Sequence, residues 1–359
     1  MIRDLLVNAG IEAMERGVLP DPVVRAGIRR LCRQRLDEHR RRDPAARVRV
    51  MDRLVASMRQ GPIAPASRAS NEQHYELPPA FFELVLGPHR KYSSGWWPGG
   101  TQTLADAEAA ALAATCEHAE LADGMDVLEL GCGWGSLTLW MAERYPDSRI
   151  TAVSNAASQR RFIEAEVRRR SLSNVRVLTA DMNSFAAPGD YDRVVSVEMF
   201  EHMRNYDELL ARVAGWLRPE GCLLVHVFCH REYAYPFQTE DSDDWMGRHF
   251  FTGGLMPSVD LLGRFDEDLA VTQQWWWDGT HYARTAEAWL ANMDAQRAAI
   301  MPIMEQVYAA DATRWFRRWR VFFMACAELF AYDGGREWGV GHFALTPAPA
   351  SVVPVPVGR

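Results

Sequence analysis

The sequence has little that would anchor it in a membrane, hold a metal or link it by disulfides. No stretch approaches the ~18 consecutive apolar residues that a bilayer-spanning helix needs. The six cysteines form no Cys-x-x-Cys pair, so we expect no zinc or other metal site and favour a reducing compartment. No apolar run near the N-terminus ends in an A-x-A-like site, so we expect no signal peptide and a cytoplasmic protein.

The chain also lacks an excess of positive charge, because 47 acidic residues outnumber 40 lysines and arginines. The formal net charge of −7 argues against a general nucleic-acid binder. The exception is the stretch from Val23 to Arg59, which is rich in arginine, poor in acids and carries a moderate apolar face. This pattern predicts a solvated helical hairpin packed on the core. A basic surface for an anionic membrane is the alternative.

The stretch from Asp126 to Leu139, DVLELGCGWGSLTL, predicts a buried strand, a glycine-rich turn and the start of a helix. Glycines 131, 133 and 135 let the backbone turn sharply and approach a ligand, and the helix N-terminus offers unpaired N–H groups. The spacing is Gly-x-Gly-x-Gly, not the Gly-x-Gly-x-x-Gly of a pyrophosphate site. It is typical of motif I of class I S-adenosylmethionine (SAM) methyltransferases. A structural tight turn in another α/β protein is the alternative.

Strands and helices alternate after this unit. The pattern predicts strands at Arg149–Val153, Val175–Leu178, Arg193–Val197 and Cys222–Phe228, with helices at Gln159–Arg170 and Tyr206–Leu217 between them. Later stretches predict two long helices, Ala286–Met304 and Thr313–Phe330, and a final antiparallel strand pair, Val271–Trp277 and Gly339–Leu345. We therefore predict the α/β fold of class I SAM-dependent methyltransferases, a Rossmann-like doubly wound sheet with an N-terminal helical region and a helical lid or insert.

Composition divides the chain further. We expect an N-terminal helical region and linker at 1–70, a helical cover of the SAM site at 71–120, the Rossmann-like core at 121–230, a helical lid or substrate region at 231–335 with a strand near 271–277, a final strand at 336–346, and a disordered tail at 347–359.

Polar residues at strand ends are the candidate SAM ligands, because the carboxyl ends of the strands face the ligand crevice. Asn155 and Gln159 follow the second strand, where most class I methyltransferases place an acid for the ribose hydroxyls. Asp181 ends the third strand and is placed to accept from the adenine amine. An exposed loop acid is the alternative for Asp181.

The densest cluster of chemical groups follows the fourth strand. Glu198, Glu201 and His202 lie in VEMFEHM, and a helical turn there would put both carboxylates on one face. Two carboxylates and an imidazole suit the recognition and deprotonation of a cationic amine. A capped helix start with stabilising acids is the alternative.

Methyl transfer from a sulfonium moves positive charge to the acceptor, so aromatic faces are natural liners of the site. Each aromatic residue taken singly is more often part of the core. The candidates are Tyr92, Trp96, Trp97, Phe200, Phe228, Phe237, Tyr282, Tyr332 and Trp338.

Eleven collinear stretches resemble the cyclopropane-fatty-acid synthase superfamily, and within it the coclaurine N-methyltransferase branch. They are QHYELP, FFELVLG, KYSS, LGCGWGSL, SNAASQ, SVEMFEHM, VHVFCH, FFTGG-x-MPS, HYART, AELFAY and EWGVGHF. The resemblance implies amine methylation by Glu198, Glu201 and His202. It implies SAM contacts at Tyr92, Ser93, Gly131, Asn155, Gln159, Asp181, Met182 and Val197.

In the lipid synthases of this superfamily, the positions matching Glu201, His226 and Tyr282 help to hold a bicarbonate that acts as base, together with a cysteine. The resemblance places Ser94 at that cysteine, so we do not expect bicarbonate to be required. This difference also separates the chain from the plant enzymes.

Two functions remain open from the sequence. One is the SAM-dependent N-methylation of a small-molecule amine, with His226 among the substrate-binding residues. The other is methylation or cyclopropanation of unsaturated phospholipid acyl chains, the only case in which we expect peripheral membrane contact. A binding protein that keeps a SAM site without catalysis is a third, weaker alternative. A homodimer is the assembly that we consider.

Overall fold

The computed structural model describes residues 2–66, 77–240 and 244–348. These residues form a seven-stranded sheet of order β3-β2-β1-β4-β5-β9-β8. Strands β1 to β5 pair in parallel, and β9 pairs antiparallel with both β5 and β8. The bounds are β1 (Asp126–Leu130), β2 (Arg149–Ser154), β3 (Val175–Thr179), β4 (Tyr191–Val197), β5 (Leu217–His230), β8 (Leu269–Asp278) and β9 (Trp338–Pro347). The predicted doubly wound sheet and its final antiparallel pair are confirmed.

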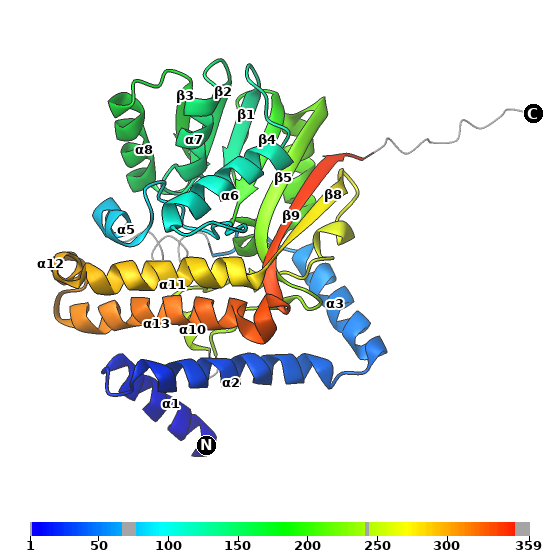
Figure 1. Ribbon diagram of the computed structural model, residues 1–359. Coiled ribbons are helices and arrows are strands. Elements are labelled where there is room, and N and C mark those ends of the chain that lie inside the picture. Colours follow the sequence, from blue (N-terminus) through cyan, green and yellow to red (C-terminus); the bar gives the residue numbers. More distant parts are fainter. Residues whose placement is uncertain (1, 67–76, 241–243, 349–359) are drawn as a thin grey trace, which may run out of the picture.

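Helices cover both faces of this sheet (Figure 1). They are α6 (Leu104–His118), α7 (Ser136–Arg144), α8 (Ala157–Arg169) and α9 (Tyr206–Trp216). Because the parallel strands are covered on both sides, Val127, Leu128 and Leu130 of β1 are all buried. The covered sheet leaves its carboxyl edge as the place where a ligand can enter.

A helical layer crosses that edge (Figure 1) and is built from α11 (Gly279–Ala295), α12 (Arg297–Tyr308) and α13 (Ala312–Phe330). The prediction of one helix over Ala286–Met304 was wrong. The chain begins the helix earlier, where the Asp278 carboxylate accepts from the Thr280 N–H, and breaks at Gln296. Met293 before the break and Ile300 after it both belong to the same apolar cluster.

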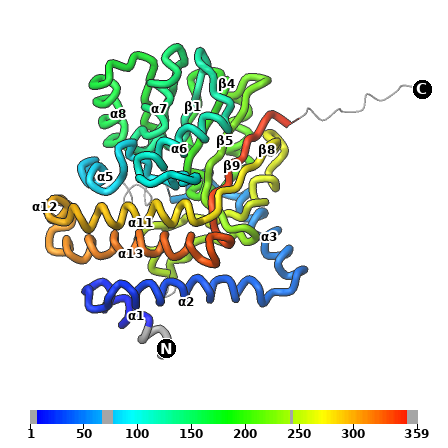
Figure 2. Tube along the Cα trace, in the orientation of Figure 1, coloured from blue at the N-terminus to red at the C-terminus, as the bar shows by residue number. Residues whose placement is uncertain are grey.

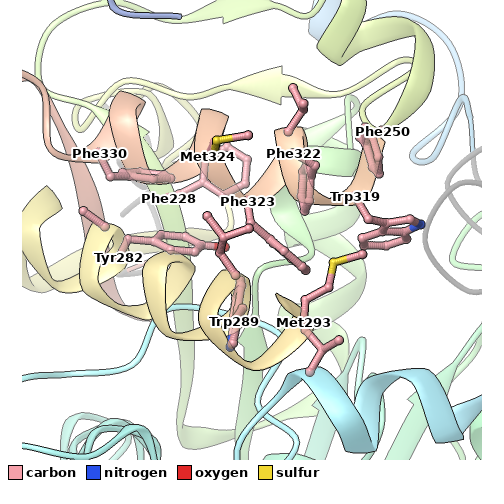
Figure 3. Packing of buried hydrophobic residues seen from close by; sticks show 14 of the residues in the cluster. Phe228, Phe250, Tyr282, Trp289, Met293, Trp319, Phe322, Phe323, Met324 and Phe330 are labelled. Carbon is pink, nitrogen blue, oxygen red and sulfur yellow. The ribbon is translucent and has the colours of Figure 1, made fainter. Parts of the chain in front are cut away.

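The contact between α11 and α13 is largely aromatic. Figure 3 shows Tyr282 and Trp289 of α11 facing Phe323 and Phe330 of α13. The Tyr282 and Phe330 rings stack at 4.3 Å between centroids. The layer is therefore fixed against the sheet edge by well-ordered ring packing.

The N-terminal helices are α1 (Ile2–Glu15), α2 (Asp21–Arg40) and α3 (Pro44–Met58). Helices α1 and α2 lie beyond α13, whereas α3 lies on the β8 side of the sheet (Figure 2). Arg25 forms ion pairs with Glu287 of α11 and Glu328 of α13, and Arg29 also pairs with Glu328. Two arginines of the arginine-rich stretch therefore dock it on the helical layer. This supports the packed hairpin over the membrane surface.

The remaining elements connect these layers. They are α5 (Pro79–Val85), η1 (Phe200–His202), α10 (Trp245–His249), η2 (Leu262–Arg264), η3 (Ala309–Asp311), η4 (Tyr332–Gly335) and the pair β6 (Tyr235–Pro236) and β7 (Leu255–Met256). The predicted linker lies partly outside the described residues. The predicted tail begins too early, because β9 runs to Pro347, and the rest of it lies outside the description. No helix among the described residues is long and apolar enough to cross a bilayer.

Candidate active site

Two adjoining cavities open at the carboxyl ends of the parallel strands, and both are lined by Gly131, Gly133 and Glu198. The first cavity continues along Val153, Ser154, Asn155, Gln159, Ala180, Met182, Met199, His202, Met203 and Ala64. The second continues along Arg90, Lys91, Tyr92, Ser93, Leu112, Thr115, Glu129, Cys132, Trp134, Ser136, Leu137 and Val197. Glu198 stands at the junction.

The three glycines of the turn have different physical roles. All have positive φ, which favours glycine. A Cβ on Gly133 would meet no atom within 4 Å, so this backbone faces open space where a ligand can approach. The prediction that Gly135 binds the cofactor is not supported, because it lines neither cavity. A Cβ there would lie 2.7 Å from Cγ1 of Ile163, so Gly135 lets α7 pack on α8.

The other predicted cofactor residues divide between the cavities. Asn155, Gln159 and Met182 line the first, whereas Tyr92, Ser93 and Val197 line the second. Asp181 lines neither, although both of its chain neighbours line the first, and its Oδ1 accepts from the Asn183 N–H at 2.8 Å.

Unpaired polar atoms in both cavities fit a polar ligand. Gln159 is 1% exposed, and its Nε2 has no hydrogen-bond partner among the described residues. The buried Oγ of Ser136, at the N-terminus of α7, is likewise unpartnered there. Buried polar atoms are normally paired. With the open face of Gly133, they fit the hydroxyl and amino-acid groups of SAM.

Glu198 is held in a conformation that few non-glycine residues adopt, with φ of 49°. Its Oε1 accepts from the Ser94 N–H at 3.0 Å and lies 3.3 Å from Nε2 of His226. Its Oε2 accepts from the Tyr282 hydroxyl at 2.6 Å. The surrounding sheet and helices thus compensate the backbone strain and aim one carboxylate at the cavity junction.

Burial raises the pKa of Glu198, while the charge of Lys91 and the hydrogen bonds from Tyr282 and Ser94 oppose that shift. The Lys91 ammonium donates to Oγ of Ser93 at 2.6 Å and to the carbonyl of Ser94 at 2.7 Å. Burial lowers the pKa of Lys91 to about 8. A buried carboxylate with a raised pKa beside a buried ammonium is typical of a functional site.

The prediction that Glu198 and Glu201 share a helix face was wrong. Glu198 precedes the short 3-10 turn η1 and has a left-handed backbone, so the two residues do not share a helical turn. Glu201 lines neither cavity, and its Oε2 has no hydrogen-bond partner among the described residues. Burial, and then the charge of Glu198, raise its pKa well above the ordinary range, which favours a neutral carboxylic acid. His202 does line the first cavity and stacks on Phe251.

A chain of aromatic rings runs from His202 to Tyr282 beside these groups. The Phe251 ring stacks on the His202 ring and packs on Phe228, with the ring centroids 5.7 Å apart. Phe228 in turn contacts Phe330, with the centroids 6.2 Å apart. Phe237 joins at Phe251. Phe228, Phe237 and Tyr282, which the sequence predicts as candidate liners, belong to this group of rings but line neither cavity. Phe251 and Phe330 were not among those candidates.

Other predicted substrate residues lie elsewhere. Phe200 is in the core, with its carbonyl accepting from the Tyr206 hydroxyl. Trp338 is fully buried and donates to the Tyr235 hydroxyl, and Tyr332 packs on Trp338. None of the three lines either cavity, and ring packing and these hydrogen bonds account for their positions. Their role as substrate residues stays a prediction.

Trp96 stacks on Trp277 at 5.4 Å between ring centroids, next to the buried His226. It lines neither cavity. His226 contacts the Glu198 carboxylate from behind the cavities, so it supports the site rather than a substrate directly.

Sequence reasoning also missed Glu129 and Lys91, which line the second cavity. Burial raises the pKa of Glu129 to about 8. An acid within an otherwise apolar buried strand was the available signal, since such a residue is costly unless it has a function. No cluster of potential metal ligands occurs among residues 2–66, 77–240 and 244–348.

The strand order, the glycine-rich turn after β1 and the polar cavities at the carboxyl edge define a class I SAM-dependent methyltransferase. Residues 65–335 match the family described as mycolic acid cyclopropane synthetase. The chain belongs to that family.

Curated relatives include an (S)-coclaurine N-methyltransferase from Thalictrum flavum subsp. glaucum, which is 37% identical over 92% of this chain and 93% of its own. A cyclopropane-fatty-acyl-phospholipid synthase from Escherichia coli (strain K12) is 31% identical over 75% of this chain and 66% of its own.

Among solved structures, a coclaurine N-methyltransferase bound to N-methylheliamine and SAH superposes with a TM-score of 0.90 and 34% identity. The superposition covers 93% of this chain and 98% of the coclaurine N-methyltransferase chain. The cyclopropane synthase MmaA2 from Mycobacterium tuberculosis, at a TM-score of 0.66 and 23% identity over 79% of this chain and 98% of its own, shares the fold.

Proposed function

We propose that the protein transfers a methyl group from SAM to the nitrogen of a small-molecule amine. The observation that carries the proposal is the Glu198 carboxylate at the junction of two cavities, one suited to each half of the cofactor. The resemblance to coclaurine N-methyltransferases over nearly the whole chain supports it.

SAM supplies a methyl group on a sulfonium, an electrophile that needs no metal. Asn155 and Gln159 are placed to bind the ribose side in the first cavity, whereas Glu129 and Ser136 face the amino-acid side in the second. The N-terminus of α7 adds its unpaired N–H groups, which suit the carboxylate of the amino-acid part of SAM. These residues orient the ligand so that its methyl group points toward the junction.

The acceptor nitrogen must be neutral, because a protonated amine has no lone pair with which to attack. Glu198 attracts the ammonium form and takes its proton, and Tyr282 and Ser94 hold the carboxylate in place meanwhile. Glu201 interacts electrostatically with Glu198 and is itself kept as a neutral acid. The imidazole of His202 lines the first cavity. The rings of Phe228, Phe251 and Phe330 form a nearby apolar wall for an aromatic or alkyl amine.

We also propose that turnover needs no bicarbonate. The backbone N–H of Ser94 already donates to Glu198, and its hydroxyl donates to the Gly95 carbonyl. Tyr282 and His226 contact the same carboxylate. Three of the four positions that the resemblance assigns to bicarbonate in lipid synthases, Ser94, His226 and Tyr282, thus contact the Glu198 carboxylate of this protein.

The test is formation of S-adenosylhomocysteine in degassed buffer, with and without bicarbonate, on a panel of secondary amines and on unsaturated phospholipid vesicles. We expect turnover of an amine without bicarbonate. Activity on lipid with strong bicarbonate stimulation would overturn the proposal in favour of acyl-chain alkylation.

Variants assign the roles. Glu198→Gln cannot accept a proton and should lower kcat by roughly 10²–10⁴ while SAM still binds. Glu201→Ala should also lower kcat with SAM binding retained. Glu164→Gln, which changes a partly exposed carboxylate paired with Arg160, is the matched control and should behave like the parent. Equal rates for Glu198→Gln and the control would exclude Glu198 as the proton acceptor.

A cytoplasmic location is part of the same proposal and is supported by six cysteines that are all free. Peripheral membrane contact belongs to the lipid alternative, and the docking of the arginine-rich helices argues against it. A homodimer stays a proposal that sedimentation would test.

A further inference from the structure

A row of three histidines runs from Glu198 across the sheet toward the surface. His226 of β5 and His342 of β9 are cross-strand partners, and Trp275 of β8 is the next partner of His342. His118, at the C-terminal end of α6, stacks on Trp275 at 4.0 Å between ring centroids. Neighbouring strands therefore place these rings side by side without any help from sequence proximity.

The contacts along the row are continuous. Oε1 of Glu198 lies 3.3 Å from Nε2 of His226. The ring centroids of His226 and His342 are 4.4 Å apart, and Nδ1 of His342 lies 2.9 Å from Nδ1 of His118. His226 and His342 are fully buried, whereas His118 is only partly buried. The row thus joins the catalytic carboxylate to a residue that solvent reaches.

The two buried rings also hold unpaired nitrogens. Among the described residues, Nδ1 of His226 and Nε2 of His342 have no hydrogen-bond partner. Each is the nitrogen opposite the one that contacts the next group in the row. Buried polar atoms of this kind call for an explanation. The two rings are in contact, and a reorientation of one ring would be needed to bring these two nitrogens within hydrogen-bond distance.

We propose that this row is a proton path, which carries the proton taken from the substrate amine out of the buried site. The path consists of Glu198, His226, His342 and His118. The inference rests on the proposed amine methylation, because that reaction leaves a proton on Glu198 in each turnover. When cofactor and amine fill both cavities, they close the front of Glu198, and the histidines behind it remain as an exit.

Transfer along the path keeps each imidazole neutral. One ring nitrogen accepts a proton while the other nitrogen of the same ring releases one, so one proton leaves His118 for each proton that leaves Glu198. Nothing is oxidised or reduced. The rings return to their starting tautomers by reorientation before the next proton.

The electrostatic surroundings favour this neutral relay over a resting imidazolium. Burial, and then the charge of Lys91, lower the pKa of His226 well below its ordinary value. Burial, His226, His118 and Lys91 do the same for His342. Burial lowers the pKa of His118, which Glu117 partly opposes. The ring of Trp277 lies 4.1 Å from His342 and 5.7 Å from His226 and shields both.

The test uses His118→Ala, because this outermost ring can be removed with the least damage to the core. His89→Ala is the matched control, since His89 is also half-buried, packs on a tryptophan, Trp140, and lies outside the path. Steady-state kcat with SAM and an accepted amine is measured in weakly buffered solution, with added imidazole, and in H₂O and D₂O. SAM affinity is measured by calorimetry.

We expect His118→Ala to lower kcat about tenfold, less than a directly acting base contributes. SAM affinity should stay unchanged, the solvent isotope effect should rise, and imidazole should restore kcat in a saturable manner. His89→Ala should match the parent. His342→Asn should lower kcat without imidazole rescue, because its site is closed to solvent.

An unchanged kcat in His118→Ala, or a loss that imidazole does not restore, would overturn the proton path. In either case amine turnover by the parent would leave the proposed function standing. Failure of the parent to methylate any amine would remove the proposed function and the path together.

Discussion

Replacing Tyr282 with phenylalanine should shift the pH dependence of catalysis toward alkaline pH. The Tyr282 hydroxyl donates to Oε2 of Glu198 at 2.6 Å, and the bond stabilises the ionised carboxylate. Without this hydrogen bond, burial raises the pKa of Glu198 further. The carboxylate would then form only at higher pH.

The size of the shift follows from the strength of the bond. A hydrogen bond to a charged group contributes about 1.5–3 kcal/mol, and 1.36 kcal/mol corresponds to one pKa unit, so the shift should be roughly 1–2 units. Glu198 is 8% exposed in its side chain, so solvent screens this interaction little. The loss of kcat should be large at acidic pH and small at alkaline pH.

The assay is kcat against pH for one accepted amine, with a methyl-transfer isotope effect to show that chemistry limits the rate. Tyr235→Phe is the control, because it removes another buried hydroxyl, one that contacts Trp338 and not Glu198. The same midpoint in Tyr282→Phe, Tyr235→Phe and the parent would refute the role of Tyr282. A uniform loss at every pH would point to positioning of the site instead.

Three further outcomes are expected. Asp181→Ala should weaken SAM binding by roughly 1.5–3 kcal/mol if its carboxylate binds the adenine amine, and unchanged affinity by calorimetry would remove it from the site. Gly135→Ala should cost roughly 2–4 kcal/mol of unfolding free energy, from its left-handed backbone and the contact with Ile163, whereas Gly189→Ala, in open space, should melt like the parent. Burial raises the pKa of Glu129 from 4.5 to about 8. The folded state therefore holds a proton that the unfolded chain has released, and stability falls as pH rises through that window. Thermal melts at pH 5 and pH 8 should differ less for Glu129→Gln than for the parent, and equal slopes would contradict this.

Sequence reasoning reached the sheet because its signals are local. The alternation of apolar strands and amphipathic helices, and the glycines after β1, depend on neighbours within a few residues. The predicted strand at Val271–Trp277 lies within β8, and the one at Gly339–Leu345 within β9. The prediction of one helix over Ala286–Met304 missed the break at Gln296, because glutamine is an ordinary helix former and marks no helix end in the sequence.

In the site, too, some features follow from local sequence and others depend on contacts between distant segments. Residues at strand ends, such as Asn155, could be placed near a ligand, because all parallel strands end at one edge. The orientation of Glu198 could not be predicted, because its backbone is left-handed and its carboxylate is held by Ser94 and Tyr282, which are distant in sequence.

The sequence by itself determined the class of fold, the edge at which the ligand binds and the residues that could do chemistry there, since periodicity and strand ends are local properties. The tertiary structure alone decided which carboxylate faces the cavities, which aromatic rings form the wall, and that His226, His342 and His118 lie in one row. These depend on the register of β5, β8 and β9 and on the packing of α6 and α11, and such contacts between distant segments leave no periodic pattern in the chain.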